Sequence, residues 1–191
     1  DRSPGEFYQL DFEMAFATQE DVFANAEEVL SAVFEKFGGK PVSPAPFKRI
    51  PYAESMLKYG TDKPDLRNPL IITELSDLFV DSDFKPFANT AVSQTEMITK
   101  TATDLTGMAS QSKGFFEKME AFAKEIGMKG LGYVKVDESF KYLGPIDKFL
   151  NDEQREELKN RCALEVGDVL YFIADNKKMA PKFAGQIRTE V

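Results

Sequence analysis

The chain has 191 residues, 42% of them hydrophobic and 29% charged, a balance typical of a globular protein with one medium or two small domains. Its formal net charge of −8 lacks the basic footprint of a module that binds nucleic acid by neutralising phosphates, although a local RNA contact stays open. Having no histidine and a single cysteine, Cys162, the sequence excludes imidazole-based catalysis, histidine or thiolate metal sites, and an internal disulfide framework.

Carboxylates, amides, lysine and arginine are left to carry any chemistry. The single cysteine is typical of a reducing compartment, and we expect the cytoplasm. No apolar run approaches the length of a membrane span, so we expect no membrane partner. The first residue is Asp rather than Met, so we expect an excised or processed piece of a longer chain.

The first predicted element is a strand over residues 7–17, because apolar and polar residues alternate along it without a break. One face of this strand carries apolar side chains: Tyr8, Leu10, Phe12, Met14 and Phe16. The other face carries Gln9, Asp11 and Glu13. Alternation alone favours a sheet face turned to water. The alternative is the floor of a pocket, with two carboxylates and an amide directed at a ligand.

A helix is predicted from Thr18 to about Phe37, because its apolar residues keep helical spacing. Thr18 is a good N-cap residue, and Asp21 stands three residues later, as in a capping box. Two glycines end the helix, and a proline-rich, extended connection follows over residues 40–51.

A short helix over residues 51–59 then leads into the string YGTDKPDLRNP, residues 59–69. This string packs four charges, two prolines and a glycine into eleven residues, which favours a solvated loop or a domain linker. The alternative is an ordered charged loop near an anionic ligand.

Residue 68 begins a different pattern of short strands and helices. The expected elements are a strand and short helix at 71–79, a short strand at 84–87, a strand or hairpin with a loop at 88–106, a helix at 112–126, a strand at 130–136, a helix capped by Asn151, a strand at 169–174 and a final helix at 180–189. This order predicts an α+β unit with an antiparallel or mixed sheet. The one long strand and one long helix of residues 1–67 cannot close a core alone, whereas residues 68–185 have the size of an ordinary domain.

Several segments, in chain order, resemble parts of bacterial-type aspartyl-tRNA synthetases of class II. DRSPGEFYQLDFEMAF resembles the second half of motif 2, and RIPYAESMLKYGTDKPDLRNP resembles the segment that follows it. GLGYVKV, GPIDKFL and GDVLYFIADNKK resemble the GAD insertion domain between motifs 2 and 3, and FAGQIRTEV resembles the return into the catalytic domain. Residues 88–106 match poorly.

The resemblance implies that residues 1–67 are part of the class II antiparallel catalytic sheet with its helix, that residues 68–185 are the GAD insertion domain, and that residues 186–191 start the return. It implies that Gln9 and Asp11 contact the substrate aspartate, whose ammonium needs acceptors. Glu13, on the same face, is implied as their neighbour in the aspartate-binding site. Ser3 falls where many members of the family carry a glutamine that contacts ATP, so this chain departs from the pattern at its ATP-binding position.

A parent enzyme follows from the resemblance: a homodimer that activates L-aspartate with ATP and Mg²⁺ and transfers it to tRNA. Motif 1, the arginine-containing start of motif 2, motif 3 and the anticodon-binding domain have no counterpart in these residues. Class II catalysis depends on positioning and neutralising phosphates by arginine and Mg²⁺. We therefore expect this chain alone to be inactive and monomeric, with no catalytic residue, no metal site and no bound cofactor.

Two other interpretations remain. A GAD-like domain also occurs in the B subunit of the tRNA-dependent amidotransferase, so the later part alone also fits a non-catalytic, tRNA-associated binding module. The strings QLDFE and YGTDKPDLR favour the synthetase over that module. An unrelated α+β domain with a solvated first strand is disfavoured by the ordered match over several segments.

Overall fold

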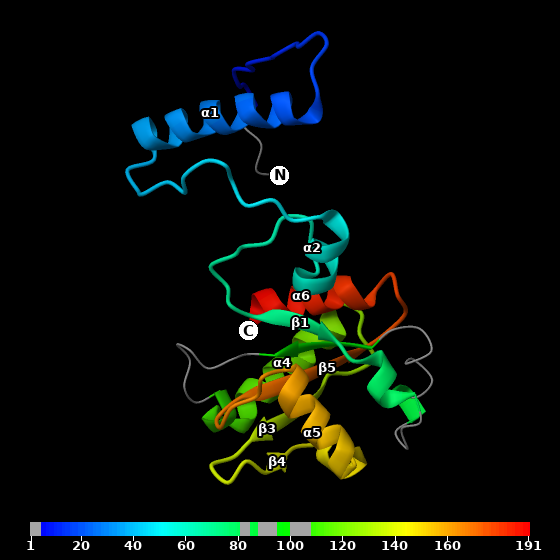
Figure 1. Ribbon diagram of the computed structural model, residues 1–191. Helices are drawn as coiled ribbons and strands as arrows, with labels where there is room; N and C mark the ends of the chain where they lie inside the picture. Colours follow the sequence, from blue (N-terminus) through cyan, green and yellow to red (C-terminus); the bar gives the residue numbers. More distant parts are fainter. Residues whose placement is uncertain (1–4, 81–84, 88–94, 100–107) are drawn as a thin grey trace. The chain divides into compact units, whose positions relative to one another are not determined.

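The structure, a computed structural model, forms two compact units, Asp1–Arg49 and Ile50–Val191 (Figure 1). It describes residues 5–80, 85–87, 95–99 and 108–191, and for residues 95–99 it describes the backbone alone. The boundaries that the sequence pattern and the family resemblance predict at residues 67/68 and 185/186 stay a prediction. Each unit is described by itself below.

The first unit is organised by helix α1, Gln19–Phe37. The Thr18 hydroxyl accepts the Asp21 backbone N–H at 3.3 Å, and the Asp21 carboxylate accepts the Thr18 N–H at 2.8 Å, which confirms the predicted capping box. After the helix the chain returns to it through Arg49, which pairs with Glu20 and stacks its guanidinium over the Phe23 ring at 4.6 Å. None of the residues of α1 is buried.

The strand predicted over residues 7–17 is not formed. Residues 7–14 have no regular secondary structure, and residues 15–16 form a bend. A strand needs a neighbour that completes its hydrogen bonds, and residues 5–49, the described part of this unit, contain no second strand. Its apolar side chains are exposed: Phe7, Tyr8, Leu10, Phe12, Met14 and Phe16. The prediction was therefore wrong for this chain. Alternation shows that one side of the segment is apolar, but it does not show that a neighbouring strand is present to form the hydrogen bonds.

The second unit is built on a five-stranded sheet in the order β1-β2-β5-β3-β4, in which every neighbouring pair is antiparallel. Its strands are β1 Ile71–Glu74, β2 Thr95–Thr99, β3 Gly132–Val136, β4 Tyr142–Leu143 and β5 Val169–Ala174. The α+β class is confirmed, and the sheet of this unit is antiparallel rather than mixed.

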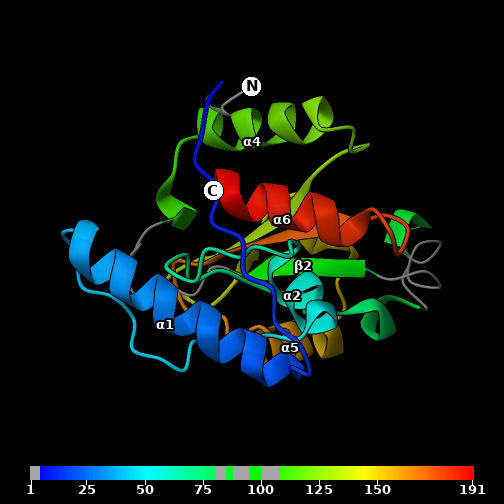
Figure 2. The same cartoon turned by 90° about the horizontal axis from the view of Figure 1, so that it is seen from above.

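Helices cover both faces of this sheet. They are α2 Tyr52–Tyr59, α4 Lys113–Glu125, α5 Asp152–Arg161 and α6 Ala180–Glu190, with 3₁₀ turns η1 Ser76–Phe79, η2 Met108–Ser110 and η3 Asp147–Phe149. Helices α4 and α6 lie on one face and α5 lies on the other (Figure 2). These elements confirm the helices expected at 51–59, 112–126, after Asn151 and at 180–189.

Two expectations around residue 90 have different outcomes. The short strand expected at 84–87 is wrong, because residues 85–87 are helical. Pro86 has no N–H for a strand ladder, and Phe87 packs its ring instead against Phe79 and Phe172, at centroid distances of 5.2 and 5.5 Å. Within residues 88–106 the expected strand is confirmed as β2, and the remainder of that segment lies outside the described residues.

Strand β5 is the centre of the second unit. Tyr171 and the residues two away from it pack into the cluster under α4 and α6, whereas Leu170 and Phe172 pack into the cluster under α5. Because both faces are covered, the strand reads as a continuous apolar run, VLYFIA, rather than as an alternation.

A close approach of two glycines joins the end of α2 to α6. Gly60 has a φ of +68°, and a Cβ placed on it would lie 2.2 Å from the Pro181 carbonyl oxygen. A Cβ on Gly185 would lie 2.6 Å from the Gly60 carbonyl oxygen. Both positions therefore require glycine, for space and, at Gly60, also for backbone conformation.

We expect Gly185→Ala to lower the free energy of unfolding by about 1 kcal/mol or more, because the added methyl group forces α2 and α6 apart. This direction opposes intrinsic helix propensity, which favours alanine over glycine by about 1 kcal/mol. The matched control is Gly114→Ala in α4, where a Cβ would meet only the Ser112 hydroxyl at 3.7 Å, and which we expect to be neutral or stabilising. Urea unfolding followed by circular dichroism measures both, and a Gly185→Ala chain as stable as the control would contradict the close approach.

Candidate functional site

The predicted aspartate-binding residues lie in the segment before α1. Gln9 donates its amide N–H to Asp11 Oδ1 at 2.7 Å, so the structure brings these two side chains together. No hydrogen bond of the described residues joins Glu13 to this pair. All three side chains are exposed. Ser3 lies outside the described residues.

The pair Gln9–Asp11 is an acceptor site. The amide N–H bond orients the carboxylate, and the Gln9 carbonyl oxygen and the carboxylate oxygens are acceptors of the kind that an ammonium group needs. Neither side chain neutralises a phosphate. The arrangement therefore suits the recognition of a cationic nitrogen and not the stabilisation of a phosphoryl group.

The string YGTDKPDLRNP forms an ordered loop that is held from the inside by Arg188 of α6. The guanidinium donates from Nε to the Leu70 carbonyl at 2.7 Å, and from Nη2 to the Asp65 and Asn68 carbonyls at 3.0 and 2.8 Å. Arg188 is 2% exposed, and its guanidinium lies 5.1 Å from the centre of the Tyr59 ring. The expected solvated loop is therefore confirmed in the exposure of its charged side chains, and its backbone is ordered by Arg188; the anionic ligand of the alternative interpretation stays a prediction.

Arg188 is not among the functional candidates that the sequence predicts. Its only signal is a cation on the buried face of α6, next to Ile187 and one turn after Ala184. A buried cation needs compensation, which this pattern could have flagged. The partners are backbone carbonyls about 120 residues earlier, and side-chain patterns do not report them.

The outer side of the loop carries a paired charge. Arg67 binds Asp65 with Nε at 2.9 Å from Oδ1 and Nη2 at 2.6 Å from Oδ2. The hydrogen bonds from Arg67 lower the pKa of the Asp65 carboxyl to about 2. Asp65 is therefore ionised at neutral pH, and the positive charge of Arg67 in the same loop neutralises it.

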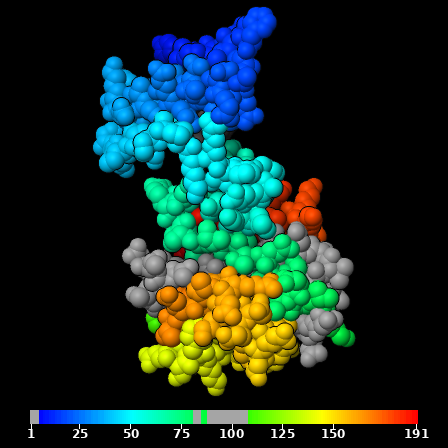
Figure 3. Space-filling model, in the orientation of Figure 1, coloured from blue at the N-terminus to red at the C-terminus, as the bar shows by residue number. Residues whose placement is uncertain are grey.

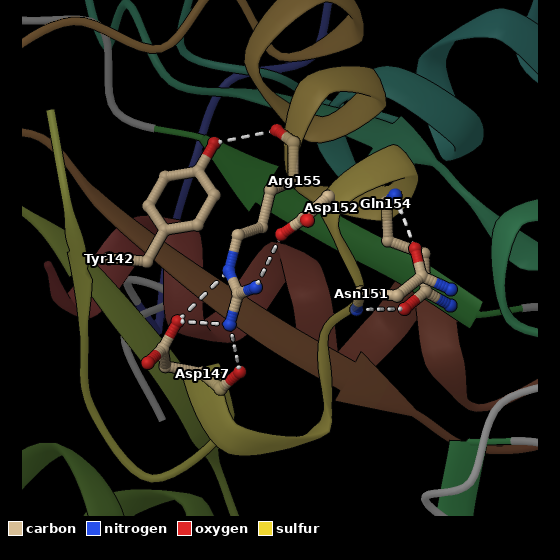
Figure 4. A network of polar contacts seen from close by, with 6 residues as sticks. All are labelled: Tyr142, Asp147, Asn151, Asp152, Gln154 and Arg155. Atoms are coloured by element: carbon tan, nitrogen blue, oxygen red, sulfur yellow. Dashed lines mark hydrogen bonds and ion pairs between the residues drawn. The ribbon is translucent and has the colours of Figure 1, made fainter.

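A surface pocket of about 580 Å³ lies in the second unit, between the β4 hairpin and α5. Figure 3 shows these segments, in yellow and orange, side by side on one face of the unit. In the pocket Arg155 donates to the Asp147 carboxylate at 2.9 and 3.2 Å and to Asp152 at 3.3 Å (Figure 4). The Tyr142 hydroxyl donates to the Arg155 carbonyl at 3.0 Å, and burial raises its pKa to about 12.

Four polar residues of this pocket bond to one another: Tyr142, Asp147, Asp152 and Arg155. The bonds of Arg155 and Tyr142 tie the β4 hairpin and η3 to the first turns of α5. Such a network is explained by the packing of three elements without a ligand. We therefore take it as a structural fastening of α5.

Other chemistry in the described part of the chain is limited. Cys162 is buried, and burial raises the pKa of its thiol to about 12, so the thiol is protonated and is not a nucleophile. Among the described residues no three or more His, Cys, Asp or Glu side chains are grouped to hold a metal ion. In the same residues no helix is both long and apolar enough to cross a membrane.

The family model described as tRNA synthetases class II (D, K and N) matches residues 1–183. The aspartate–tRNA(Asp/Asn) ligase of Rickettsia bellii (strain OSU 85-389) is 47% identical over 191 residues, which are 100% of this chain and 31% of that protein. Proteins of the same name from Rickettsia canadensis (strain McKiel) and Rickettsia prowazekii (strain Madrid E) are also 47% identical over 191 residues. The chain thus spans about a third of the length of these curated relatives. Because the family model covers almost all of it, the chain belongs to the class II tRNA synthetases of the D, K and N group.

Proposed function

We propose that the chain is part of an aspartate–tRNA ligase, whose full-length form activates L-aspartate with ATP and transfers it to tRNA. The observation that carries this proposal is the 47% identity, over the whole chain, to proteins named aspartate–tRNA(Asp/Asn) ligase. The hydrogen-bonded pair Gln9–Asp11 supports it, because its chemistry suits the ammonium of an amino acid.

Within that enzyme Gln9 and Asp11 bind the ammonium of the substrate aspartate. Holding the ammonium fixes the α-carboxylate for attack on the α-phosphorus of ATP, which releases pyrophosphate and leaves aspartyl-adenylate. A terminal ribose hydroxyl of tRNA then attacks the adenylate carbonyl, and AMP leaves. Glu13 is the neighbour that keeps this face anionic. Ser3 is the position at which resembling enzymes carry a glutamine that contacts ATP, and its side chain is shorter than glutamine and reaches less far.

Further features of the parent belong to the same proposal. Mg²⁺ accompanies ATP and is held in part by its phosphates. The parent is a cytoplasmic homodimer. Residues 1–67 belong to its catalytic domain, residues 68–185 to the GAD insertion domain, and residues 186–191 to the return.

The competing interpretation as a non-catalytic GAD module fits the second unit alone. The family model begins at residue 1, however, and the match to the Rickettsia proteins includes the whole first unit. Among the residues that the structure describes, no feature favours the amidotransferase subunit over the synthetase.

We predict that the purified 191-residue chain does not catalyse aspartate-dependent exchange of pyrophosphate into ATP. The proposed pocket residues bind an ammonium, and groups that neutralise phosphates are expected outside this chain. The assay compares the chain with a buffer blank. Exchange clearly above the blank would contradict the assignment of these residues to substrate binding alone.

In the full-length protein we predict that Asp11→Asn lowers kcat/KM for aspartate in the exchange assay by about 10- to 100-fold, because a charge-assisted hydrogen bond is worth about 1.5–3 kcal/mol. The matched control, Glu138→Gln, removes an exposed carboxylate of the second unit, outside the proposed site, and should change kcat/KM by less than about threefold. Thermal melting separates this effect from unfolding, and its midpoint should not move. Equal kinetics for Asp11→Asn and the unmodified protein would return the residues 7–17 to a water-facing role.

A further inference from the structure

The polypeptide chain enters and leaves the sheet of the second unit through two segments that lie side by side. Helix α2 and the loop to Leu70 lead into the sheet, and α6 leads out of it, and the two helices pack together (Figures 1 and 2). Asn68 Nδ2 donates to the Arg188 carbonyl at 2.9 Å, and Gly60 meets Gly185. A body whose entering and leaving segments touch has the geometry of a domain inserted into a host.

Arg188 closes this junction. All three acceptors of its guanidinium are backbone carbonyls in residues 65–70, on the entering segment, while Arg188 itself is on the leaving helix. No carboxylate in the described part of the chain forms an ion pair with it, and Asp65 pairs with Arg67 instead. We call Arg188 and Asn68, with the carbonyls that they bind, the clasp.

The clasp depends on the shape of the arginine fork. Nε and Nη2 point at carbonyls of different residues, which a lysine ammonium, one centre on a flexible stem, cannot reach together. Asn68 adds a second layer, since its Oδ1 accepts the Leu70 N–H at 2.9 Å. Without the fork, part-buried carbonyls lose their donors and the entering segment is released from α6.

We propose that Arg188 is a positioning residue that holds the body from β1 to β5 in a fixed position on α2 and α6, and that this fixed position serves the binding of tRNA. That tRNA is the substrate affected rests on the proposed function. Aspartate and ATP are small enough to be enclosed in a catalytic pocket, whereas tRNA is large enough to reach an inserted domain as well. When the clasp is loosened, the domain becomes more mobile, and binding of tRNA must order it at a cost in conformational entropy. KM for tRNA therefore rises, while adenylate formation is unaffected.

The first experiment measures the clasp in the 191-residue chain and does not depend on the proposed function. Trypsin cleaves after Arg67, whose side chain is 90% exposed, only when the neighbouring backbone opens. We expect Arg188→Lys to accelerate this cleavage about tenfold or more, because opening becomes easier. The matched control, Arg161→Lys, disturbs surface pairs of similar number, with Asp77 and Glu157, and should leave the rate unchanged.

An unchanged rate of cleavage after Arg67 in Arg188→Lys would overturn the clasp. If that variant does not fold, Asn68→Ala replaces it. This change removes the two side-chain bonds of Asn68 and keeps the guanidinium, and we expect it to accelerate cleavage in the same direction.

The second experiment uses the full-length protein. In Arg188→Lys we expect KM for tRNA to rise about tenfold and aspartate-dependent pyrophosphate exchange to stay within about twofold, whereas a merely structural role would lower both activities together. Arg161→Lys should match the unmodified protein in both assays. An unmodified protein without exchange activity would overturn the proposed function, while the trypsin result would still stand. An active protein in which Arg188→Lys leaves KM for tRNA unchanged would overturn this inference alone.

Discussion

Both units depend on the burial of apolar side chains away from water, and the two units differ in how far they achieve it. In the second unit β5 is buried on both faces, between α4 with α6 and α5, and the two clusters around it form a closed core. In the first unit no residue of α1 is buried, and the apolar side chains before it are exposed as well. One unit therefore satisfies its own hydrophobic pattern, whereas the other presents a pattern that needs a partner surface.

The junction of the second unit solves a different problem, the fixing of two segments far apart in the chain. A buried arginine and an asparagine bind the backbone of residues 65–70, and two glycines allow α2 and α6 to touch. The charged string is thereby ordered from within, and its outer pair, Asp65 and Arg67, is self-contained. The string can thus be rich in charge and proline and still be a rigid part of the fold.

The sequence predicted what is decided locally. The capping box of Thr18 and Asp21 uses residues three apart, and the helices and most strands of the second unit follow from short-range patterns. It failed where the partner is distant or lacking: the alternation of residues 7–17 found no second strand, and Phe87 is placed by rings from elsewhere in the fold. Of the candidate site, Gln9 and Asp11 were placed by family resemblance, and the structure adds their hydrogen bond. Arg188 was missed because its acceptors are carbonyls more than 100 residues away.

The central claim is that the second unit is complete by itself and the first is not. Amide hydrogen exchange of the 191-residue chain tests it most directly, because protection reports the free energy needed to open each element. We expect the β5 amides to exchange slowly, about 100-fold or more below the rate of an unfolded chain, and the α1 amides to exchange within about tenfold of that rate. Protection of α1 equal to that of β5 would contradict it, because the first unit would then be stable without further cover.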